Sequence, residues 1–350
     1  MSLIFIIILA ILILVFLLMI YKSLPPTKLF VNEKNLIKIK PSIINKKNHL
    51  EYLKKYRIKK FINLDSTTSE ILYTDNKKEN ALIWIHGYND YYFHFHVGEE
   101  LLKNGYDVYA ITLRNYGKIA KDRRYLHYVK NWNSYFEDIN NSLEWITKNK
   151  KHKKFVLYGH STGGLISTIY MNEGKYKNIF NGLILNSPFF DFYGSDITEF
   201  IIKYIFYYIS YIFPTFVTSA GSNKIFKVPY YKNILKRYHF NQNYKLTYPS
   251  HIFVSYLQNA AYQQNRIQNN QINISKPILV LHSEKSTMWP KCNDNTDCVL
   301  DVEEIKKYSK LIGDNVKLQS LDGAIHDVLL SKKDITKNGI KNMIEFLNNL

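Results

Sequence analysis

The sequence predicts an α/β fold, in which helices cover both faces of a mostly parallel sheet. Short continuous apolar runs alternate with stretches long enough for a helix, a pattern typical of buried parallel strands joined by helical crossovers. The chain has 350 residues, of which 46% are hydrophobic and 15% aromatic. This composition is sufficient for one large domain with a sizeable core, and it argues against global disorder.

The predicted elements follow one another in chain order. Strands are expected over residues 81–85, 106–111, 155–158, 183–185, 277–281 and 316–321. Helices are expected over residues 91–104, 132–149 and 302–312. Residues 22–75 form a polar lead-in with possible edge strands, and the main domain is expected over residues 76–350.

The alternation stops between about residues 190 and 275, which predicts a helical cap inserted over the sheet. The cap segment contains the run FIIKYIFYYISYIFPTFV at residues 200–217. This run can form an apolar wall for a substrate, pack on the sheet, or dock at shallow depth on a membrane. Its length and Lys203 argue against a full membrane span.

The N-terminus is apolar without interruption from residue 3 to residue 20, LIFIIILAILILVFLLMI, which predicts a transmembrane anchor within residues 1–21. No Lys or Arg precedes the run and no small-residue cleavage site follows it. These features favour an uncleaved single-pass anchor over a cleaved signal peptide, and hence a membrane location. Lys22, Lys28 and Lys34 favour a cytoplasmic domain. Lysine is common throughout the chain, so the orientation stays open.

A net charge of +18 can attract nucleic acid or an anionic membrane surface, but the lysines are scattered and no nucleic-acid-binding signature accompanies them. The charge is therefore interpreted as spread over a solvated surface, and no nucleic-acid partner is expected. The two cysteines, Cys292 and Cys298, lie in one polar stretch and can form a local disulfide or remain free thiols. No metal or cofactor is expected. His94-Phe95-His96 lacks a third ligand at a fitting spacing and is interpreted as part of a helix surface.

Residues 155–166, FVLYGHSTGGLI, carry a glycine-rich turn between a predicted strand and a predicted helix. A phosphate-binding loop would need Lys and Ser or Thr after its last glycine, but Leu165 and Ile166 follow Gly164. The turn instead reads Gly159-His160-Ser161-Thr162-Gly163, the G-x-S-x-G pattern of a serine held on a sharp bend. Side chains in place of the two glycines would collide with neighbouring backbone. Ser161 is therefore the candidate nucleophile.

A serine nucleophile needs a base and an acid that orients the base. His326 directly follows the last predicted strand and is the candidate base. The acid is expected in the loop 284–301, and Asp301 is favoured because it precedes the helix-like run that starts at Val302. Asp294 and Asp297 flank the cysteines and read as solvated turn residues, but they remain alternatives.

Two backbone N–H groups are expected to stabilise a negatively charged oxygen in the transition state. Thr162 supplies the first, because it follows the nucleophile at the start of a helix. Tyr88 supplies the second, in the His86-Gly87-Tyr88 segment after the strand at residues 81–85.

With these motifs in place, the chain resembles the α/β-hydrolase superfamily, in particular its serine-aminopeptidase-like (S33) branch, which includes monoacylglycerol lipases and lysophospholipases. The matching segments run from about residue 81 to residue 331 and are WIHGYNDYYFHFH, GYDVYAITLRNYGK, FVLYGHSTGGLIS, LILNSPFFD, KPILVLHSEKS, VLDVEEI and LDGAIHDVLLS. The resemblance implies an eight-stranded, mostly parallel sheet with a helical cap. It also implies Ser161, His326 and Asp301 as a catalytic triad, with the oxyanion hole at Tyr88 and Thr162.

The sequence thus predicts a membrane-anchored serine hydrolase that cleaves carboxylic esters through an acyl-enzyme. An aromatic cap favours a lipid-like ester of the monoacylglycerol or lysophospholipid type as its partner. Two alternatives remain: an acyltransferase with the same triad, and a membrane-tethered binding protein without catalysis. Dehalogenases and epoxide hydrolases share the fold but carry an aspartate at the bend, so Ser161 argues against both.

Overall fold

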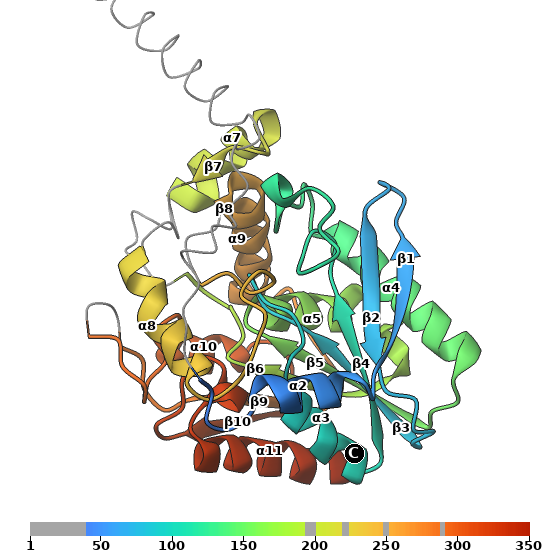
Figure 1. Cartoon of the computed structure of the whole chain (residues 1–350). Helices are drawn as coiled ribbons and strands as arrows, with labels where there is room; N and C mark the ends of the chain where they lie inside the picture. The colour runs from blue at the N-terminus through green and yellow to red at the C-terminus, as the bar shows by residue number, and fades with distance from the viewer. Residues whose placement is uncertain (1–39, 193–200, 219–223, 248–251, 288–290) are drawn as a thin grey trace, which may run out of the picture.

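The computed structural model describes residues 40–192, 201–218, 224–247, 252–287 and 291–350 (Figure 1). The anchor predicted within residues 1–21 lies outside these residues. Within the described part of the chain, no helix combines the length and the hydrophobicity needed to cross a bilayer.

An eight-stranded sheet forms the centre of the molecule, in the order β1-β2-β4-β3-β5-β6-β9-β10. The strands are β1 (Arg57–Ile62), β2 (Thr68–Tyr73), β3 (Asn80–Ile85), β4 (Tyr106–Thr112), β5 (Lys154–His160), β6 (Phe180–Asn186), β9 (Ile278–Ser283) and β10 (Val316–Leu321). All strands from β4 to β10 in this order pair in parallel, whereas β1 and β2 pair with their neighbours in antiparallel fashion. The predicted α/β fold with a mostly parallel sheet is therefore confirmed.

The helices flank the sheet or form the segment over its carboxyl edge. They are α2 (Lys46–Leu53), α3 (Phe95–Lys103), α4 (Asn133–Asn149), α5 (Thr162–Glu173), α7 (Phe206–Ile212), α8 (Lys224–Leu235), α9 (Val254–Gln268), α10 (Val302–Ser309) and α11 (Lys333–Asn348). Short helical turns are η2 (Arg123–Tyr125), η3 (Lys177–Ile179), the π-helical turn η4 (Ile201–Ile205) and η5 (Val328–Leu330).

The core lies on both faces of the sheet, because the side chains of a strand alternate between them. On one face, Ile83 and Ile85 of β3 belong to a buried cluster that includes residues of α4, α5 and α10. On the other face, Leu82 and Trp84 pack in a second cluster with residues of α3 and α11. Both faces of β3 are thus covered, which explains why its sequence is apolar without interruption.

The inserted segment between β6 and β9 contains η4, α7, α8 and α9, with a two-stranded antiparallel ribbon of β7 (Val217–Thr218) and β8 (Ile252–Phe253). We call this segment the cap. In Figure 1, α7 lies at one end of the molecule and α11 at the opposite end.

The lead-in contains the edge strands that the sequence analysis considers possible, β1 and β2. β1 and β2 are integral strands of the sheet, since β1 pairs with β2 and β2 pairs with β4. The sheet therefore begins at Arg57, earlier than the domain boundary predicted at residue 76. β1 was hard to recognise from the sequence because five of its six residues are exposed, so this strand carries no buried hydrophobic pattern.

Candidate active site

Ser161 sits on a sharp bend between β5, which ends at His160, and α5, which begins at Thr162. Its backbone has φ 54° and ψ −120°, a conformation that costs about 1–3 kcal/mol and persists only where the surroundings enforce it. A Cβ at Gly159 would meet the backbone oxygen of Gly163, and a Cβ at Gly163 would meet that of His86. The two glycines therefore permit the close packing that the bend requires.

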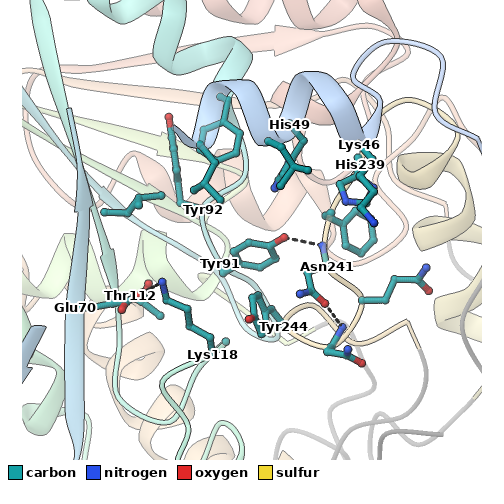
Figure 2. A pocket seen from close by; sticks show the side chains of 18 residues that line it. Lys46, His49, Glu70, Tyr91, Tyr92, Thr112, Lys118, His239, Asn241 and Tyr244 are labelled. Carbon is teal, nitrogen blue, oxygen red and sulfur yellow. Dashed lines mark hydrogen bonds and ion pairs between the residues drawn. The ribbon is translucent and has the colours of Figure 1, made fainter. Parts of the chain in front are cut away.

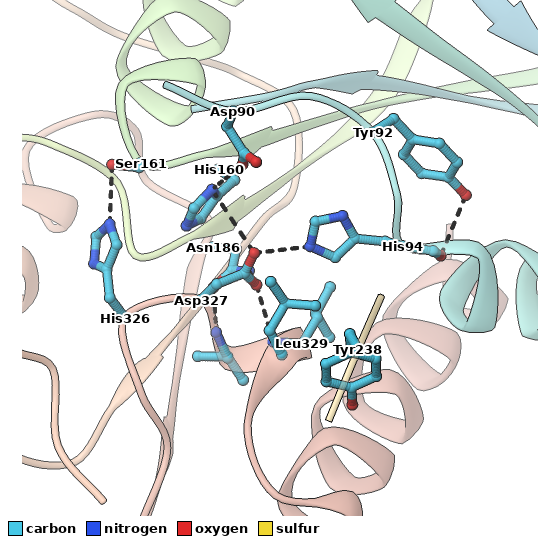
Figure 3. Close-up of polar contacts among 12 residues, drawn as sticks. Asp90, Tyr92, His94, His160, Ser161, Asn186, Tyr238, His326, Asp327 and Leu329 are labelled. Atoms are coloured by element: carbon cyan, nitrogen blue, oxygen red, sulfur yellow. Dashed lines mark hydrogen bonds and ion pairs between the residues drawn. The ribbon is translucent and has the colours of Figure 1, made fainter. Parts of the chain in front are cut away.

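Ser161 and His326 lie in contact although 165 residues separate them in the sequence (Figure 3). Oγ of Ser161 is 3.0 Å from Nε2 of His326. The other ring nitrogen, Nδ1, is 2.8 Å from Oδ2 of Asp297. This chain of contacts joins a hydroxyl, an imidazole and a carboxylate in the order that activates a serine.

The structure contradicts Asp301 as the acid partner of His326. Asp301 is the N-cap of α10: its carboxylate accepts a hydrogen bond from the Glu303 N–H at 3.0 Å and one from the Ser286 hydroxyl at 3.2 Å. The sequence correctly placed Asp301 at the start of a helix, but its carboxylate there caps the helix.

The two alternative acids have different environments. Asp294 pairs with Arg237 of the cap. Asp297, interpreted from the sequence as a solvated turn residue, is 1% exposed.

The Asp297 loop is fastened in three ways. Asp297 forms a parallel bridge with Ser286, in which its N–H donates to the Lys285 carbonyl and its carbonyl accepts from the Thr287 N–H. Its second carboxylate oxygen, Oδ1, accepts from the N–H groups of Val299 and Leu300. A disulfide joins Cys292 to Cys298, which settles the two possibilities left open by the sequence in favour of the bonded one.

Tyr88 and Thr162, the two predicted backbone donors, lie on segments that meet at Ser161. Thr162 opens α5, so its N–H is among the first four of the helix, which have no partner within it. Tyr88 follows Gly87, where a Cβ would stand 3.1 Å from the Cβ of Ser161. Glycine at this position thus allows the loop after β3 to approach the nucleophile.

A buried group of charged and titratable side chains, not predicted from the sequence, lies behind Ser161 (Figure 3). His160 Nδ1 is 3.3 Å from Oδ2 of Asp90 and 3.9 Å from Oδ2 of Asp327. Asp327 also contacts His94 at 2.8 Å, and Lys245 of the cap donates to Asp90 at 2.7 Å. The only sequence signal was position, since Asp327 and His160 are the immediate neighbours of His326 and Ser161.

The interpretation of His94-Phe95-His96 as a helix surface is wrong. His94 is completely buried, and Nε2 of His96 lies 2.9 Å from the Leu329 carbonyl oxygen. Both histidines therefore face inward and connect α3 to the segment that follows His326.

Burial and charge shift the pKa values in this group. Burial alone would raise the pKa of Asp90, but the Lys245 ammonium and His160 hold it well below its usual range. Burial also opposes ionisation of Asp327, and its contacts with His160 and His94 lower its pKa strongly. Within the described residues, Asp90, His160 and Asp327 bring three possible metal-ligand atoms within 4.8 Å of one another. The Lys245 ammonium already supplies a cation to this set, so these residues do not require a metal.

Aromatic side chains of the cap lie close to the site. The Tyr230 ring of α8 is 6.3 Å from the His326 ring, and the Tyr256 ring of α9 is 4.8 Å from the Tyr88 ring. Ser161 is 9% exposed and His326 is 3% exposed. The cap therefore contributes aromatic walls to a nearly enclosed nucleophile.

A separate cavity of about 600 Å³ lies between α2, the loop after β3 and cap residues 239–244 (Figure 2). Tyr91 and Tyr92 form part of its wall, and the Asn241 N–H donates to the Tyr91 hydroxyl at 2.7 Å. Ser161 and His326 do not line this cavity. It is thus distinct from the space around the nucleophile.

Comparisons with known proteins identify the fold and the family. A solved soluble variant of monoglyceride lipase from Saccharomyces cerevisiae is similar at a TM-score of 0.63 with 18% identity, covering 84% of this chain and 96% of the lipase. The monoacylglycerol lipase of Paleococcus ferrophilus gives a TM-score of 0.60 at 16% identity, covering 83% of this chain and 98% of that one. A thermophilic esterase from Thermogutta terrifontis gives 0.57 at 15% identity, covering 84% and 98%.

At these identities the solved structures establish the fold alone. No curated protein sequence matches the chain. The sequence profile of the S33 serine aminopeptidase family, however, matches residues 76–333, which is more than half of the chain. Since this match includes the bend at Ser161 and the contact with His326, the chain belongs to the S33 serine aminopeptidase family of serine hydrolases, with the α/β-hydrolase fold.

Proposed function

We propose that this protein hydrolyses lipid-like carboxylic esters through an acyl-enzyme on Ser161. The observation that carries the proposal is the contact chain from Ser161 Oγ through His326 to Asp297, with distances of 3.0 and 2.8 Å. Asp297 accepts a hydrogen bond from the Nδ1–H of His326, which leaves Nε2 unprotonated and able to accept the proton of the serine hydroxyl.

The reaction follows from this arrangement. Nε2 of His326 takes the Ser161 proton as Oγ attacks the acyl carbonyl carbon. The N–H groups of Thr162 and Tyr88 stabilise the oxyanion of the tetrahedral intermediate. The protonated His326 then gives its proton to the departing alcohol. Water, deprotonated by His326, finally attacks the acyl carbonyl carbon of the acyl-enzyme. The bond from this carbon to Ser161 Oγ breaks, His326 returns the proton to Oγ, and the carboxylic acid leaves.

A lipid-like substrate is supported by the aromatic cap and by two fold relatives. Tyr230 and Tyr256 bring rings close to His326 and Tyr88, and such surfaces suit an acyl chain better than a charged peptide. Two of the similar solved structures are a monoglyceride lipase and a monoacylglycerol lipase. We infer a monoacylglycerol-type or lysophospholipid-type ester from this combination.

We also propose that residues 3–20 anchor the enzyme in a membrane, on the basis of their uninterrupted apolar sequence. The expected result is that the full chain stays in the membrane fraction after alkaline extraction. Recovery in the soluble fraction would contradict the anchor. Protease digestion of sealed vesicles then reports on which side residues 40–350 lie.

A fluorophosphonate probe, which reacts with activated serines, tests the catalytic proposal. The wild-type chain should be labelled, and Ser161→Ala should not be. Ser187→Ala is the matched control, because Ser187 is also a buried serine with a positive φ of 45° at the end of a strand. Absence of labelling in correctly folded wild-type protein would refute the proposal. A panel of monoacylglycerols and lysophospholipids identifies the preferred ester.

A further inference from the structure

The cap presents an exposed face of tyrosine and isoleucine side chains. Six side chains of η4 and α7 form it, which we call the tyrosine face: Tyr204, Ile205, Tyr207, Tyr208, Tyr211 and Ile212. Tyr208 is 70% exposed, Tyr211 is 86% exposed and Ile212 is 63% exposed. Residues 204–217 contain no Asp, Glu, Lys or Arg. A helix surrounded by water on its outer side normally carries charged residues there.

The opposite side of this segment is fixed to the cap. Ile202 is buried against Leu257 and Ala261 of α9, and Phe206 packs on the same cluster. The segment therefore has one packed side and one exposed side, and its contact with α9 determines which side chains point outward. In Figure 1, α7 forms the end of the molecule that lies farthest from α11.

We propose that the tyrosine face rests on a lipid surface, with α7 lying in the plane of the interface. Tyrosine combines an apolar ring with a polar hydroxyl and is enriched where membrane meets water. At 7 residues, α7 is too short to cross a bilayer, so it lies along the surface. The absence of charge lowers the cost of approaching hydrocarbon and provides no ion pairs for steering a protein partner.

One feature of the whole chain favours a membrane over a second protein as the occupant. The apolar stretch at residues 3–20, outside the described residues, is long enough to hold this domain beside a bilayer. Docking of the tyrosine face does not depend on esterase activity, so it can be tested without turnover.

Quenching by brominated lipids tests this contact in the full chain. Tyr211→Trp is introduced in a Ser161→Ala background and reconstituted in phosphatidylcholine–phosphatidylglycerol vesicles, with and without bromine in the acyl chains. The matched control is Lys341→Trp on α11, an exposed position at the opposite end of the molecule. The parent chain, with its 4 native tryptophans, provides the background.

Bromolipids should quench the added emission of Tyr211→Trp about twofold and leave that of Lys341→Trp unchanged, because only an interfacial residue approaches the acyl chains. Equal quenching of the two variants, or none in Tyr211→Trp, would overturn the proposal. An emission that changes with protein concentration instead of bromination would assign the face to a second copy of the chain, and would also overturn it.

A second and independent observation concerns the loop that carries Tyr88. Asn89 follows Tyr88 and has a positive φ of 51°. Its side-chain amide forms a pair of hydrogen bonds with the backbone of one cap residue: Nδ2 donates to the Leu246 carbonyl at 2.8 Å, and the Leu246 N–H donates to Oδ1 at 2.8 Å. Nδ2 also donates to the Tyr231 hydroxyl at 2.9 Å.

The next residues, Asp90 of the loop and Lys245 of the cap, form a second contact between these two segments, an ion pair. The Lys245 ammonium donates to Asp90 at 2.7 Å, and the two side chains are 3% and 1% exposed. The other carboxylate oxygen of Asp90 lies 3.3 Å from His160, the residue before Ser161. The cap, the loop after β3 and the bend at the nucleophile are therefore joined by one buried set of contacts.

We infer that Asn89 and Lys245 are positioning residues, through which the cap sets the Tyr88 N–H relative to Ser161. This inference rests on the proposed function, because it assigns the Tyr88 N–H to the oxyanion. A paired amide–backbone contact is directional, so it fixes both the distance and the angle of the loop. Pre-organised donors stabilise an oxyanion because they need no rearrangement during the reaction.

Asn89→Gly tests the positioning role because glycine tolerates the positive φ while losing every contact with the cap. The matched control is Asn270→Gly, which replaces an asparagine with φ 55° at the end of α9. Asn89→Gly should lower kcat and the rate of fluorophosphonate labelling about tenfold with little change in KM, since the oxyanion donor is displaced. Asn270→Gly should keep the wild-type rates.

A general loss of folding would lower the amount of active enzyme and leave KM and the rate constant of labelling unchanged, so the readouts separate the two causes. If Asn89→Gly is labelled at the wild-type rate, the inference is wrong and the proposed function stands. If the wild-type chain itself is not labelled, both fall.

Discussion

Asp297 and Asp301 are only a few residues apart in the sequence, yet their carboxylates have different partners, and a pair of matched substitutions separates their roles. In Asp297→Asn, the side-chain oxygen can still accept from the N–H groups of Val299 and Leu300, which lie at 2.7 and 2.9 Å. The new NH₂ group then faces His326 Nδ1, which must become an acceptor. The proton moves to Nε2, and His326 can no longer accept the Ser161 proton.

The expected loss for Asp297→Asn is about 10⁴-fold in kcat, or about 5 kcal/mol in transition-state stabilisation. Asp301→Asn should behave differently, because Asn caps a helix about as well as Asp. Its cost is confined to the loss of a negative charge at the N-terminus of α10, about 0.5 kcal/mol in stability. Its kcat should stay within about twofold of the wild-type value.

Steady-state kinetics on a soluble short-chain ester, together with thermal unfolding, measure both quantities. The geometric reasoning is refuted if Asp301→Asn loses activity by orders of magnitude while Asp297→Asn retains it. Equal losses in both variants with unchanged stability would also contradict it, because Asp301 makes no contact with His326 among the hydrogen bonds of the structure.

Three further predictions concern stability. Gly163→Ala should lower the free energy of unfolding by about 3 kcal/mol in urea denaturation, since its Cβ would meet the backbone oxygen of His86. The control Gly339→Ala should be nearly neutral, because its Cβ would meet only side-chain carbons at 3.1 Å or more. Equal effects of the two substitutions would contradict the steric argument. Replacing Cys292 and Cys298 by serine opens a loop with a sequence separation of 6 and should lower the free energy of unfolding by about 2 kcal/mol. The kcat should fall less than in Asp297→Asn, because the bridge between Asp297 and Ser286 remains. Complete loss of activity would show that the disulfide alone positions Asp297. Burial lowers the pKa of His86 and of His96 to about 4, so the protein takes up protons when it unfolds below pH 6.5. The free energy of unfolding should therefore fall by up to about 3 kcal/mol per histidine as the pH drops from 6.5 to 4. This is contradicted if the urea midpoint does not change with pH, or if the free energy of unfolding of His96→Gln depends on pH as strongly as that of the wild type.

The sequence predicted what local patterns determine. Ser161 was found because its glycine neighbours, the preceding strand and the following helix all lie within one short segment. His326 was found because it follows the last strand, and the carboxyl ends of parallel strands share one edge of the sheet. Five of the six predicted strands are almost entirely buried, which makes them largely apolar. The sixth, β10, is mostly part-exposed and carries Lys317 and Gln319.

The acid and the buried charges depended on contacts between distant segments. Asp297 faces His326 because its loop pairs with Ser286 and is closed by the disulfide, and neither contact has a local sequence pattern. Lys245 stands in a polar stretch, NQNYKLTYP, that gives no sign of its burial. Asp301 was favoured because it lies at the start of a helix, and this position is correct. The Asp301 carboxylate, however, accepts a hydrogen bond from the first turn of α10 and does not contact His326.

The origin of Lys245 in the cap limits how this fold can be re-engineered. Caps are attractive segments to exchange between hydrolases when a new substrate preference is wanted, since they contribute walls and not the nucleophile. Here a foreign cap without an equivalent ammonium would leave Asp90 and Asp327 as neighbouring buried carboxylates with too little positive charge. A chimera of this enzyme therefore needs either the transplanted lysine or a neutral residue at position 90, so that the donor cap and the recipient core match in charge as well as in shape.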